Sequence, residues 1–141
     1  MEMKYLVDTD ILIDIFRGVR GSKEFILDLW NKGELCVTLI NIMEIMSGKE
    51  TRVREKREKI IEFLNEFTVL DFDKERAVLA GEIRRDYGIP FADAIIAAIA
   101  ISSGECTLVT YNERHFRKIK ELNLLVPKYR QKYRQGENDK K

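Results

Sequence analysis

The sequence predicts an α/β fold in which helices cover both faces of a parallel sheet. Short, continuously apolar runs alternate along the chain with longer segments of helical periodicity. Such runs are typical of strands that are buried on both sides of a parallel sheet. With 141 residues and a hydrophobic share of 45%, the chain has the size and composition of one globular domain. We therefore expect a three-layer α/β/α architecture with a five-stranded parallel sheet.

The first half of the chain contains two strand-like runs. The run 4–7 is apolar and β-prone and ends at Asp8, and a second run spans 35–38. Helical spacing of apolar or charged residues predicts helices over 11–16, 25–30, 40–46 and 50–67. Glycines follow the first three of these segments and end them.

The second half continues the alternation. We expect strands at 68–70, 106–110 and 124–126, and helices that begin near Asp73, Pro90 and Asn112. Pro90 occupies the first-turn position that proline tolerates best, and Gly104 ends this helix. Because the helix is apolar nearly all round, we expect it to be central. From Lys128 the chain is basic and without apolar periodicity, which predicts a domain over 1–127 and a disordered tail over 128–141.

The charge balance and the two cysteines narrow the class of protein. The formal net charge is only +1, so binding of a polyanion requires a local basic patch. Cys36 and Cys106 lie in apolar runs without the spacing of a zinc or redox motif, and we expect both to be buried thiols. We find no signal peptide, and no apolar stretch reaches the ~18 residues of a membrane span. These features favour the cytoplasm and no membrane partner.

Three acidic residues stand in unusually apolar surroundings. Asp8 ends the first strand-like run, Glu44 lies within the helix over 40–46, and Asp93 lies in the first turn of the apolar helix that Pro90 begins. An ionised carboxylate that is buried without a partner costs several kcal/mol. Such acids pair with a cation, accept strong hydrogen bonds or bind a metal. We expect all three to be buried or half-buried.

The topology of a parallel sheet can bring these acids together. Open parallel sheets bind ligands beyond the carboxyl ends of their strands, where the strand order reverses. If the first and fourth strands are neighbours, Asp8 and Asn112 face one crevice. Glu44 and Asp93 can project toward the same crevice. Carboxylate and amide oxygens, together with waters, suit octahedral Mg²⁺ or Mn²⁺.

Plainer roles for these residues stay open. Asp8 and Asn112 can cap helices, and Asp93 can favour a helix N-terminus through the macrodipole. Glu44 can be a polar position on an amphipathic helix.

Four short motifs occur in order along the chain. They are Leu6 to Asp14, Thr38 to Ile45, Phe91 to Ala97 and Leu108 to Phe116. Together they resemble the PIN domain, in particular the VapC-type toxin ribonucleases, over residues 3 to 126. The resemblance implies a PIN-like fold and an endoribonuclease that depends on Mg²⁺ or Mn²⁺. It also implies a protein that is usually a homodimer and is held inactive by a cognate antitoxin protein.

The resemblance also assigns roles to residues. The implied catalytic residues are Asp8, Glu44, Asp93 and Asn112, with Asp10 and Thr110 as candidates for supporting roles. Asp8 and Asp93 would bind the metal directly, and Glu44 would hold a metal-bound water or help to deprotonate the nucleophile. Members of the family have Asp or Asn at the position of Asn112. The neutral amide here bears on whether one or two metals bind.

The expected chemistry is hydrolysis of RNA phosphodiester bonds. A bound Mg²⁺ would orient the phosphodiester, lower the pKa of a coordinated water and neutralise charge on the phosphate oxygens. Candidate RNA contacts are the basic residues Arg17, Arg20, Lys23, Arg84 and Arg85, with solvated surface as the alternative. A metal-free ribonuclease would need paired acid and base groups. The chain has one histidine, His115, and its charged surroundings predict a surface position.

Two other functions stay open. A haloacid-dehalogenase-type phosphatase also ends its first strand in Asp-x-Asp, as Asp8 and Asp10 do, but the chain lacks the second acidic pair of that family. A non-catalytic PIN-like interaction module is compatible with the amide at Asn112. On the early helices, the apolar side chains that could form a dimer or antitoxin surface are Phe16, Phe25 and Trp30, with core packing as the alternative.

Overall fold

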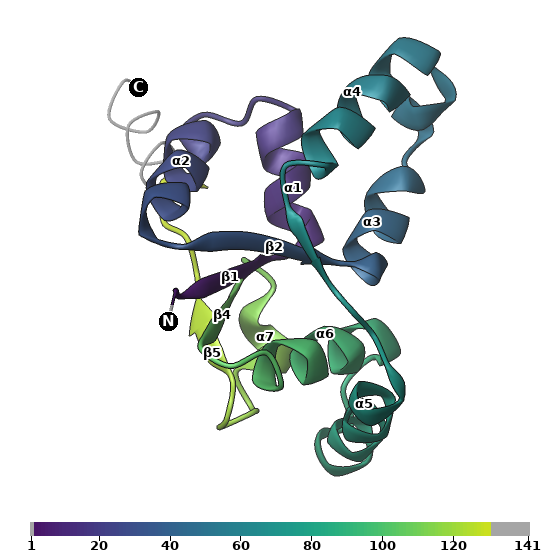
Figure 1. Ribbon diagram of the computed structural model, residues 1–141, viewed down its shortest axis with the longest axis vertical. Coiled ribbons are helices and arrows are strands. Elements are labelled where there is room, and N and C mark those ends of the chain that lie inside the picture. The colour runs from purple at the N-terminus through teal and green to yellow at the C-terminus, as the bar shows by residue number, and fades with distance from the viewer. Residues whose placement is uncertain (1, 131–141) are drawn as a thin grey trace, which may run out of the picture.

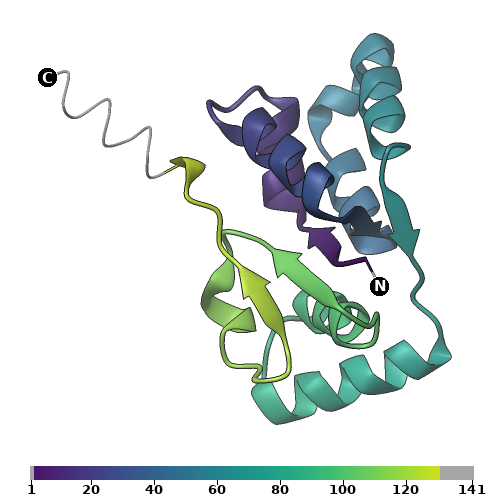
Figure 2. The same ribbon diagram turned by 60° about the vertical axis from the view of Figure 1, so that its left-hand side comes forward.

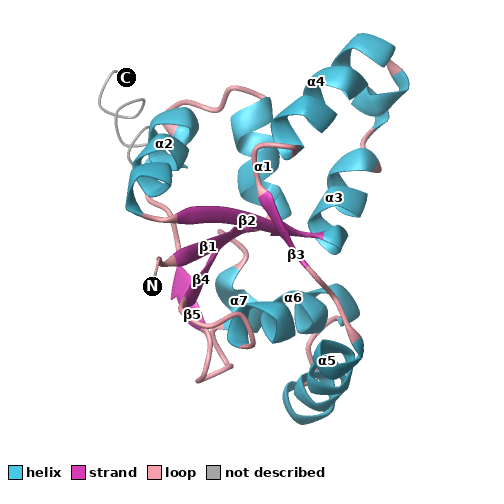
Figure 3. Ribbon diagram, in the orientation of Figure 1, coloured by secondary structure: helices cyan, strands magenta, loops and turns pink. Residues whose placement is uncertain are grey.

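Five parallel strands form the centre of the protein in the computed structural model, which describes residues 2–130. The strands are β1 (Lys4–Val7), β2 (Glu34–Thr38), β3 (Thr68–Leu70), β4 (Cys106–Val109) and β5 (Asn123–Leu125). They lie side by side in the order β3-β2-β1-β4-β5, and every neighbouring pair is parallel (Figure 1, Figure 3). The expected five-stranded parallel sheet is therefore confirmed.

Seven α-helices connect the strands. They are α1 (Thr9–Phe16), α2 (Ser22–Lys32), α3 (Leu39–Met46), α4 (Arg54–Leu64), α5 (Lys74–Tyr87), α6 (Phe91–Ile101) and α7 (Glu113–Phe116). The single helix expected over 50–67 is divided into a 3-10 turn, η1 (Lys49–Arg52), and α4. The backbone is extended at Val53 between the two, and the Thr51 hydroxyl ties the turn to the end of α3 by donating to the carbonyls of Met46 and Gly48 at 3.0 and 2.8 Å.

Helices cover both faces of the sheet and complete the three layers that the sequence predicts. α1 to α4 pack on one face, and α5 to α7 pack on the other (Figure 1, Figure 2). Leu6 points into the core beneath α5 to α7, and Val7 points into the core beneath α1 to α4. The same alternation holds for Cys36 and Val37 and for Leu108 and Val109. Because both faces are buried, these strands are apolar at successive positions.

The apolar helix α6 is central, as expected. Its residues from Ala94 to Ala100 are all buried, and it packs against α5, β4, α3 and α7. Both cysteines are buried free thiols, which was also expected. Burial raises the pKa of Cys36 to about 12 and that of Cys106 to about 11, so neither thiol is a ready nucleophile.

The first residues of the expected tail belong to the folded domain. Tyr129 is buried, and its hydroxyl and the guanidinium of Arg130 both bind Asp14 on α1. The expectation of a disordered tail is therefore wrong at these two residues, because their side chains bind a buried acid that the sequence alone does not pair with them. The rest of the expected tail, residues 131–141, lies outside the described residues. Within residues 2–130, no helix has the length and apolar character needed to cross a membrane.

Truncation of the central helix gives a test of this packing. Ile99 on α6 is fully buried, so we expect Ile99→Ala to lower the free energy of unfolding by about 2–5 kcal/mol. Val78→Ala on α5 is the matched control, because Val78 is exposed and its loss leaves no cavity. The measurement is urea denaturation of both variants and the wild type. Equal midpoints for the two variants would show that α6 is not the packed centre of the domain.

Candidate functional site

The candidate site lies where the strand order reverses. β1 is followed along the chain by β2 on one side, and its neighbour on the other side is β4, paired from Lys4 with Cys106 to Val7 with Val109. The N–H of Asp8 donates to the carbonyl of Val109 at 3.0 Å, which extends this pairing by one step. Asp8 and Thr110 therefore leave the sheet side by side at its carboxyl edge, where open parallel sheets bind ligands.

Asp8 is buried and held by hydrogen bonds from three other residues. Only 7% of the residue is exposed. One carboxylate oxygen accepts the N–H of Thr9 at 2.9 Å and the side-chain amide of Asn41 at 3.1 Å. The other accepts the hydroxyl of Thr110 at 2.8 Å. Asp8 also caps the N-terminus of α1, so the capping role that the sequence left open is confirmed for this residue.

Asn41 connects this carboxylate to α3. Its amide oxygen accepts the N–H of Thr38 at 2.9 Å and the hydroxyl of Thr38 at 2.8 Å. The N–H of Asn41 donates back to that hydroxyl at 3.2 Å, which makes a capping box. The amide nitrogen then donates to Asp8 and to the Thr9 hydroxyl, both at 3.1 Å. Asn41 has no role among those predicted from the sequence, although a Thr-x-x-Asn cap with a polar residue in an apolar helix is a usable signal.

Asp10 is the second carboxylate near the Thr110 hydroxyl. One oxygen of Asp10 accepts the N–H of Tyr111, and the other accepts the N–H of Ile11, both at 2.9 Å. The Thr110 hydroxyl is 3.4 Å from each oxygen of Asp10 and closer to Asp8. The two carboxylates therefore share one hydroxyl at the edge of the sheet.

Burial disfavours ionisation of Asp8, and the neighbouring acids add to this effect. Burial raises the pKa of Asp8 to about 6, and the negative charges of Asp10 and, more weakly, Glu44 add to this rise. The hydrogen bonds from Thr110 and Thr9 oppose it. Burial also raises the pKa of Asp10, against the N–H groups of Tyr111 and Ile11. A divalent cation beside these two carboxylates would favour the ionised form of both.

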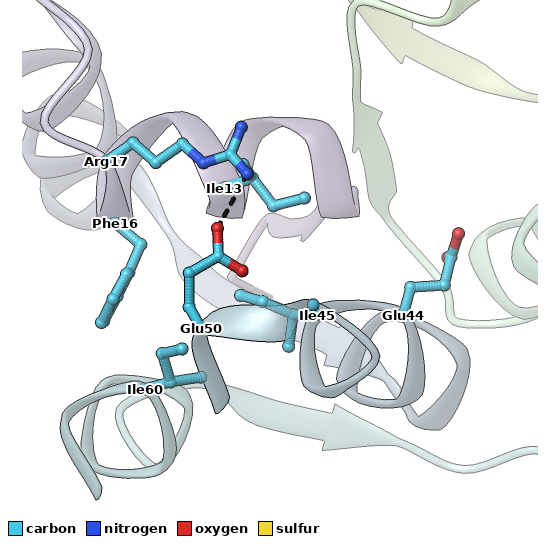
Figure 4. A pocket seen from close by; sticks show the side chains of 8 residues that line it. Ile13, Phe16, Arg17, Glu44, Ile45, Glu50 and Ile60 are labelled. Atoms are coloured by element: carbon cyan, nitrogen blue, oxygen red, sulfur yellow. Dashed lines mark hydrogen bonds and ion pairs between the residues drawn. The ribbon is translucent and has the colours of Figure 1, made fainter. Parts of the chain in front are cut away.

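Glu44 is exposed, so the expectation of a buried or half-buried side chain is wrong for this residue. The buried residues of α3 are Asn41 and Ile45, and Glu44 is not on the side of the helix that they share. Glu44 is still connected to the site, because its carboxylate accepts the Thr9 hydroxyl at 3.0 Å. It lies at the end of a pocket between α1, α3 and α4, and its carboxylate points away from the Arg17–Glu50 ion pair (Figure 4).

Asp93 is half-buried in the first turn of α6, as expected, and is paired with His115. The distance from Nδ1 of His115 to Oδ2 of Asp93 is 2.8 Å, and their side chains are 31% and 15% exposed. His115 is at the surface, as expected, but it is half-buried and paired with an acid, which its charged neighbours in the sequence do not predict. The reason is tertiary, since α7 is a single turn that packs against α6. Among residues 2–130, no hydrogen bond or ion pair joins Asp93 to Asp8.

Asn112 is exposed and reaches the site through its backbone. Its N–H donates to the Thr110 hydroxyl at 3.0 Å. It precedes α7 without capping that helix by its side chain. Within residues 2–130, no group of three or more His, Cys, Asp or Glu side chains is arranged to hold a metal ion. Asp8, Asp10 and Thr110 therefore lie closest together. Glu44 is connected to Asp8 through Thr9, whose hydroxyl donates to Glu44 and whose N–H donates to Asp8.

The basic residues proposed as RNA contacts form two separate groups. Arg17, Arg20 and Lys23 are exposed around the end of α1 and the start of α2, and Arg17 pairs with Glu50 at 3.0 Å. On α5, the guanidinium of Arg84 lies 5.1 Å from the ring centroid of Phe91, and Arg85 pairs with Asp86 at 2.8 Å.

The aromatic residues of the early helices are only partly available for a partner. Phe16 and Phe25 are half-buried and pack on the core beneath α1 to α4, so core packing explains much of their burial. Trp30 is exposed on α2.

Replacement of Asp8 by Asn tests the electrostatic description of the site. The pKa of Asp8 rises from 3.8 to about 6 on folding, so ionisation destabilises the folded state progressively between these two pH values. Above about pH 6 the penalty is complete and amounts to at most about 3 kcal/mol. We expect thermal melts in the presence of chelator to coincide near pH 4 and to show a more stable Asp8→Asn variant at pH 7. A wild type that is the more stable protein at pH 7 would contradict this description.

Comparison with known proteins places the chain in a family. A family model for the PIN domain matches residues 5–122. The tRNA(fMet)-specific endonuclease VapC of Shigella flexneri is 32% identical over 124 residues, which are 83% of this chain and 92% of that protein. The toxin-antitoxin complex from Klebsiella pneumoniae has a TM-score of 0.72 at 29% identity and covers 86% of this chain and 95% of that chain.

A further solved structure shares the fold at lower identity. VapBC2 from Rickettsia felis, bound to a DNA fragment from its promoter, has a TM-score of 0.78 at 23% identity and covers 89% of this chain and 99% of that chain. At this identity the likeness shows a shared fold. The family model and the Shigella flexneri relative show similarity of sequence. Because the family model spans most of the sequence, the chain belongs to the PIN domain family.

Proposed function

We propose that the chain is a divalent-metal-dependent endoribonuclease and the toxin component of a toxin–antitoxin pair. The observation that carries this proposal is the buried carboxylate of Asp8 beside Asp10 and Thr110, at the point of the sheet where ligands bind. The relatives named as VapC ribonucleases, together with the PIN domain match, support the same reaction. A cytoplasmic location would follow from an RNA substrate.

The donor set fits a hard divalent cation, with Mg²⁺ or Mn²⁺ as our proposal. Asp8 and Asp10 lie close enough for the charge of Asp10 to raise the pKa of Asp8, and the side-chain oxygens of Asp8, Asp10 and Thr110 are carboxylate or hydroxyl oxygens. Mg²⁺ characteristically keeps several waters and uses only one or two protein carboxylates, so a closed three-acid cage is not required. The ion, when bound, would supply charge neutralisation at the phosphate and a more acidic water.

The residues around the ion would divide the work. Asp8 would bind the ion, because its orientation is fixed by Asn41 and Thr110. Glu44 is exposed beside the site and tied to Thr9, which suits acceptance of a proton from a water molecule. Asp93 would be a further ligand only through its remaining oxygen, since His115 binds the other.

The two alternative functions differ in the support that they have. Membership of the PIN domain family leaves the haloacid-dehalogenase phosphatase without support. A non-catalytic module remains a distinct outcome of the cleavage assay, and the neutral side chain of Asn112 is its basis.

Cleavage of RNA by the purified chain tests this function. We expect structured RNA to be cut in Mg²⁺ or Mn²⁺ but not in chelator, with products that carry a 5′-phosphate and a 3′-hydroxyl. Asp8→Asn and Asp93→Asn are each expected to lower the rate about 100-fold or more, because each removes charge that the metal needs. The measurement is a time course of product formation at a fixed metal concentration.

The matched control is Asp28→Asn, since Asp28 is exposed on α2 and its ion pair among residues 2–130 is with Lys32. It should cut at the wild-type rate. If the Asp8 and Asp93 variants also cut at that rate, the activity belongs to a contaminant or to another site. A folded protein that cuts none of a panel of RNAs, alone or freed from its antitoxin, would favour the non-catalytic module.

We also propose an antitoxin protein as a partner. The Klebsiella pneumoniae relative is a toxin-antitoxin complex. The pocket beside Glu44 is lined by apolar side chains of α1, α3 and α4, including Ile13, Phe16 and Ile60, with Arg17 at its rim (Figure 4). An apolar side chain of the partner bound there would lie next to Glu44 and could block access to the site.

The proposed homodimer would use a different face. Large apolar side chains on α3 and α6 are more than half exposed: Leu39, Met43 and Phe91. α3 and α6 contact one another, so Leu39 and Met43 lie on a helix next to the one that carries Phe91. A second copy of the chain would remove these side chains from water. We propose this face for the dimer in preference to Phe16, Phe25 and Trp30, because Phe16 and Phe25 are partly covered by the core.

Light scattering after size exclusion tests the dimer. We expect a dimeric wild type and a monomeric Leu39→Lys/Met43→Lys double variant, because two charges in an apolar interface cannot be solvated there. Leu27→Lys is the control, since Leu27 is half exposed on α2, which lies away from α3 and α6 (Figure 1). A monomeric wild type at tens of micromolar would rule the dimer out, and dissociation by Leu27→Lys alone would move the interface to α2.

A further inference from the structure

The end of the described chain forms a polar cluster with α1. Asp14 is buried and lies four residues after Asp10 on α1. One of its carboxylate oxygens accepts the hydroxyl of Tyr129, together with Nε and Nη2 of Arg130 at 2.8 and 2.7 Å. Three donors thus converge on one oxygen, and the charge of Arg130 compensates a buried acid.

The same two residues hold Tyr111, which stands between Thr110 and Asn112. The N–H of Arg130 donates to the Tyr111 hydroxyl at 2.9 Å. The guanidinium of Arg130 lies 4.3 Å from the centroid of the Tyr111 ring, and the ring of Tyr129 meets that ring edge-on, with centroids 5.2 Å apart. The N–H of Tyr111 in turn donates to Asp10 at 2.9 Å.

These contacts form a closed path. It leads from Asp10 along α1 to Asp14, across to Arg130, on to Tyr111 and back to Asp10. We propose that Arg130 and Tyr129 are positioning residues that hold Asp10 and Thr110 beside Asp8 by acting through Asp14 and Tyr111. The inference rests on the proposed metal-dependent nuclease function, because it concerns the residues that would hold the ion.

The charges explain why the path matters for Asp10. Asp10 and Asp14 are separated by four residues on one helix, a spacing at which like charges repel. Arg130 is the cation that offsets both of them, since it binds Asp14 and its charge favours the ionised form of Asp10. Without it, Asp10 would be repelled from the side of α1 that faces Tyr111. Arg130 is itself only partly exposed and its guanidinium is used by Asp14 and Tyr111, which suits positioning better than binding of phosphate.

The test compares Mn²⁺ binding by four variants of the full chain. Arg130→Gln removes the charge, Arg130→Lys keeps it, and Tyr111→Phe removes only the hydroxyl that receives the N–H of Arg130. Arg54→Gln on α4 is the matched control, because Arg54 pairs with Glu58 on an exposed surface. The free Mn²⁺ concentration is measured by electron paramagnetic resonance, and thermal melts show whether each variant is folded.

We expect Arg130→Gln to weaken Mn²⁺ binding about ten-fold, as loss of a supporting hydrogen bond at a metal site commonly does. Tyr111→Phe should weaken binding in the same direction by less, Arg130→Lys should retain most of the affinity, and Arg54→Gln should equal the wild type. In RNA cleavage, the defect of Arg130→Gln should shrink as the Mn²⁺ concentration rises, with KM for RNA unchanged.

Wild-type Mn²⁺ affinity in folded Arg130→Gln and Tyr111→Phe would overturn the inference. A raised KM for RNA at unchanged Mn²⁺ affinity would also overturn it, because Arg130 would then be a substrate contact. If Arg130→Gln does not fold, the affinity of Tyr111→Phe decides. A wild type that binds Mn²⁺ and cuts RNA keeps the proposed function whatever the variants show, whereas a wild type that does neither removes both proposals.

Discussion

The buried carboxylate of Asp8 is the group on which the arrangement of the site depends. It stands where β1 ends and α1 begins, and its hydrogen bonds reach α3 through Asn41 and the end of β4 through Thr110. Three segments that are far apart in the sequence are thereby fixed to one side chain. The cost of burying that charge is only partly met by these donors, so the pKa of Asp8 stays high. The carboxylate of Asp8 therefore organises the local structure, and its negative charge is not balanced by a cation there.

Much of the fold could be predicted from the sequence because its two periodicities are strong. Apolar runs such as 4–7 and 106–109 are buried on both faces, and the nearly all-apolar helix α6 can only be central. Asp8 and Thr110 could be placed at one edge because the carboxyl ends of parallel strands share that edge. These inferences need only local pattern and the general geometry of parallel sheets.

The rest of the site depends on contacts that no local pattern contains. The exposure of Glu44 is decided by which side of α3 enters the core, and the position of His115 by how one turn of helix packs on α6. Tyr129 and Arg130 read as polar tail residues, since their partner Asp14 is more than a hundred positions away along the chain. In each case the deciding interaction is tertiary, and polar residues can satisfy it from almost any place in the sequence.

The side-chain amide of Asn41 uses both of its ends, because its oxygen accepts two hydrogen bonds from Thr38 and its nitrogen donates to Asp8 and Thr9. Its orientation cannot be reversed without placing donor against donor and acceptor against acceptor. An acid at this position would keep the acceptor end but would set a second carboxylate against Asp8. The number of acids that this sheet edge can tolerate is thus limited by the number of N–H and O–H groups that face it. Redesign toward tighter metal binding would have to add donors before it adds charge.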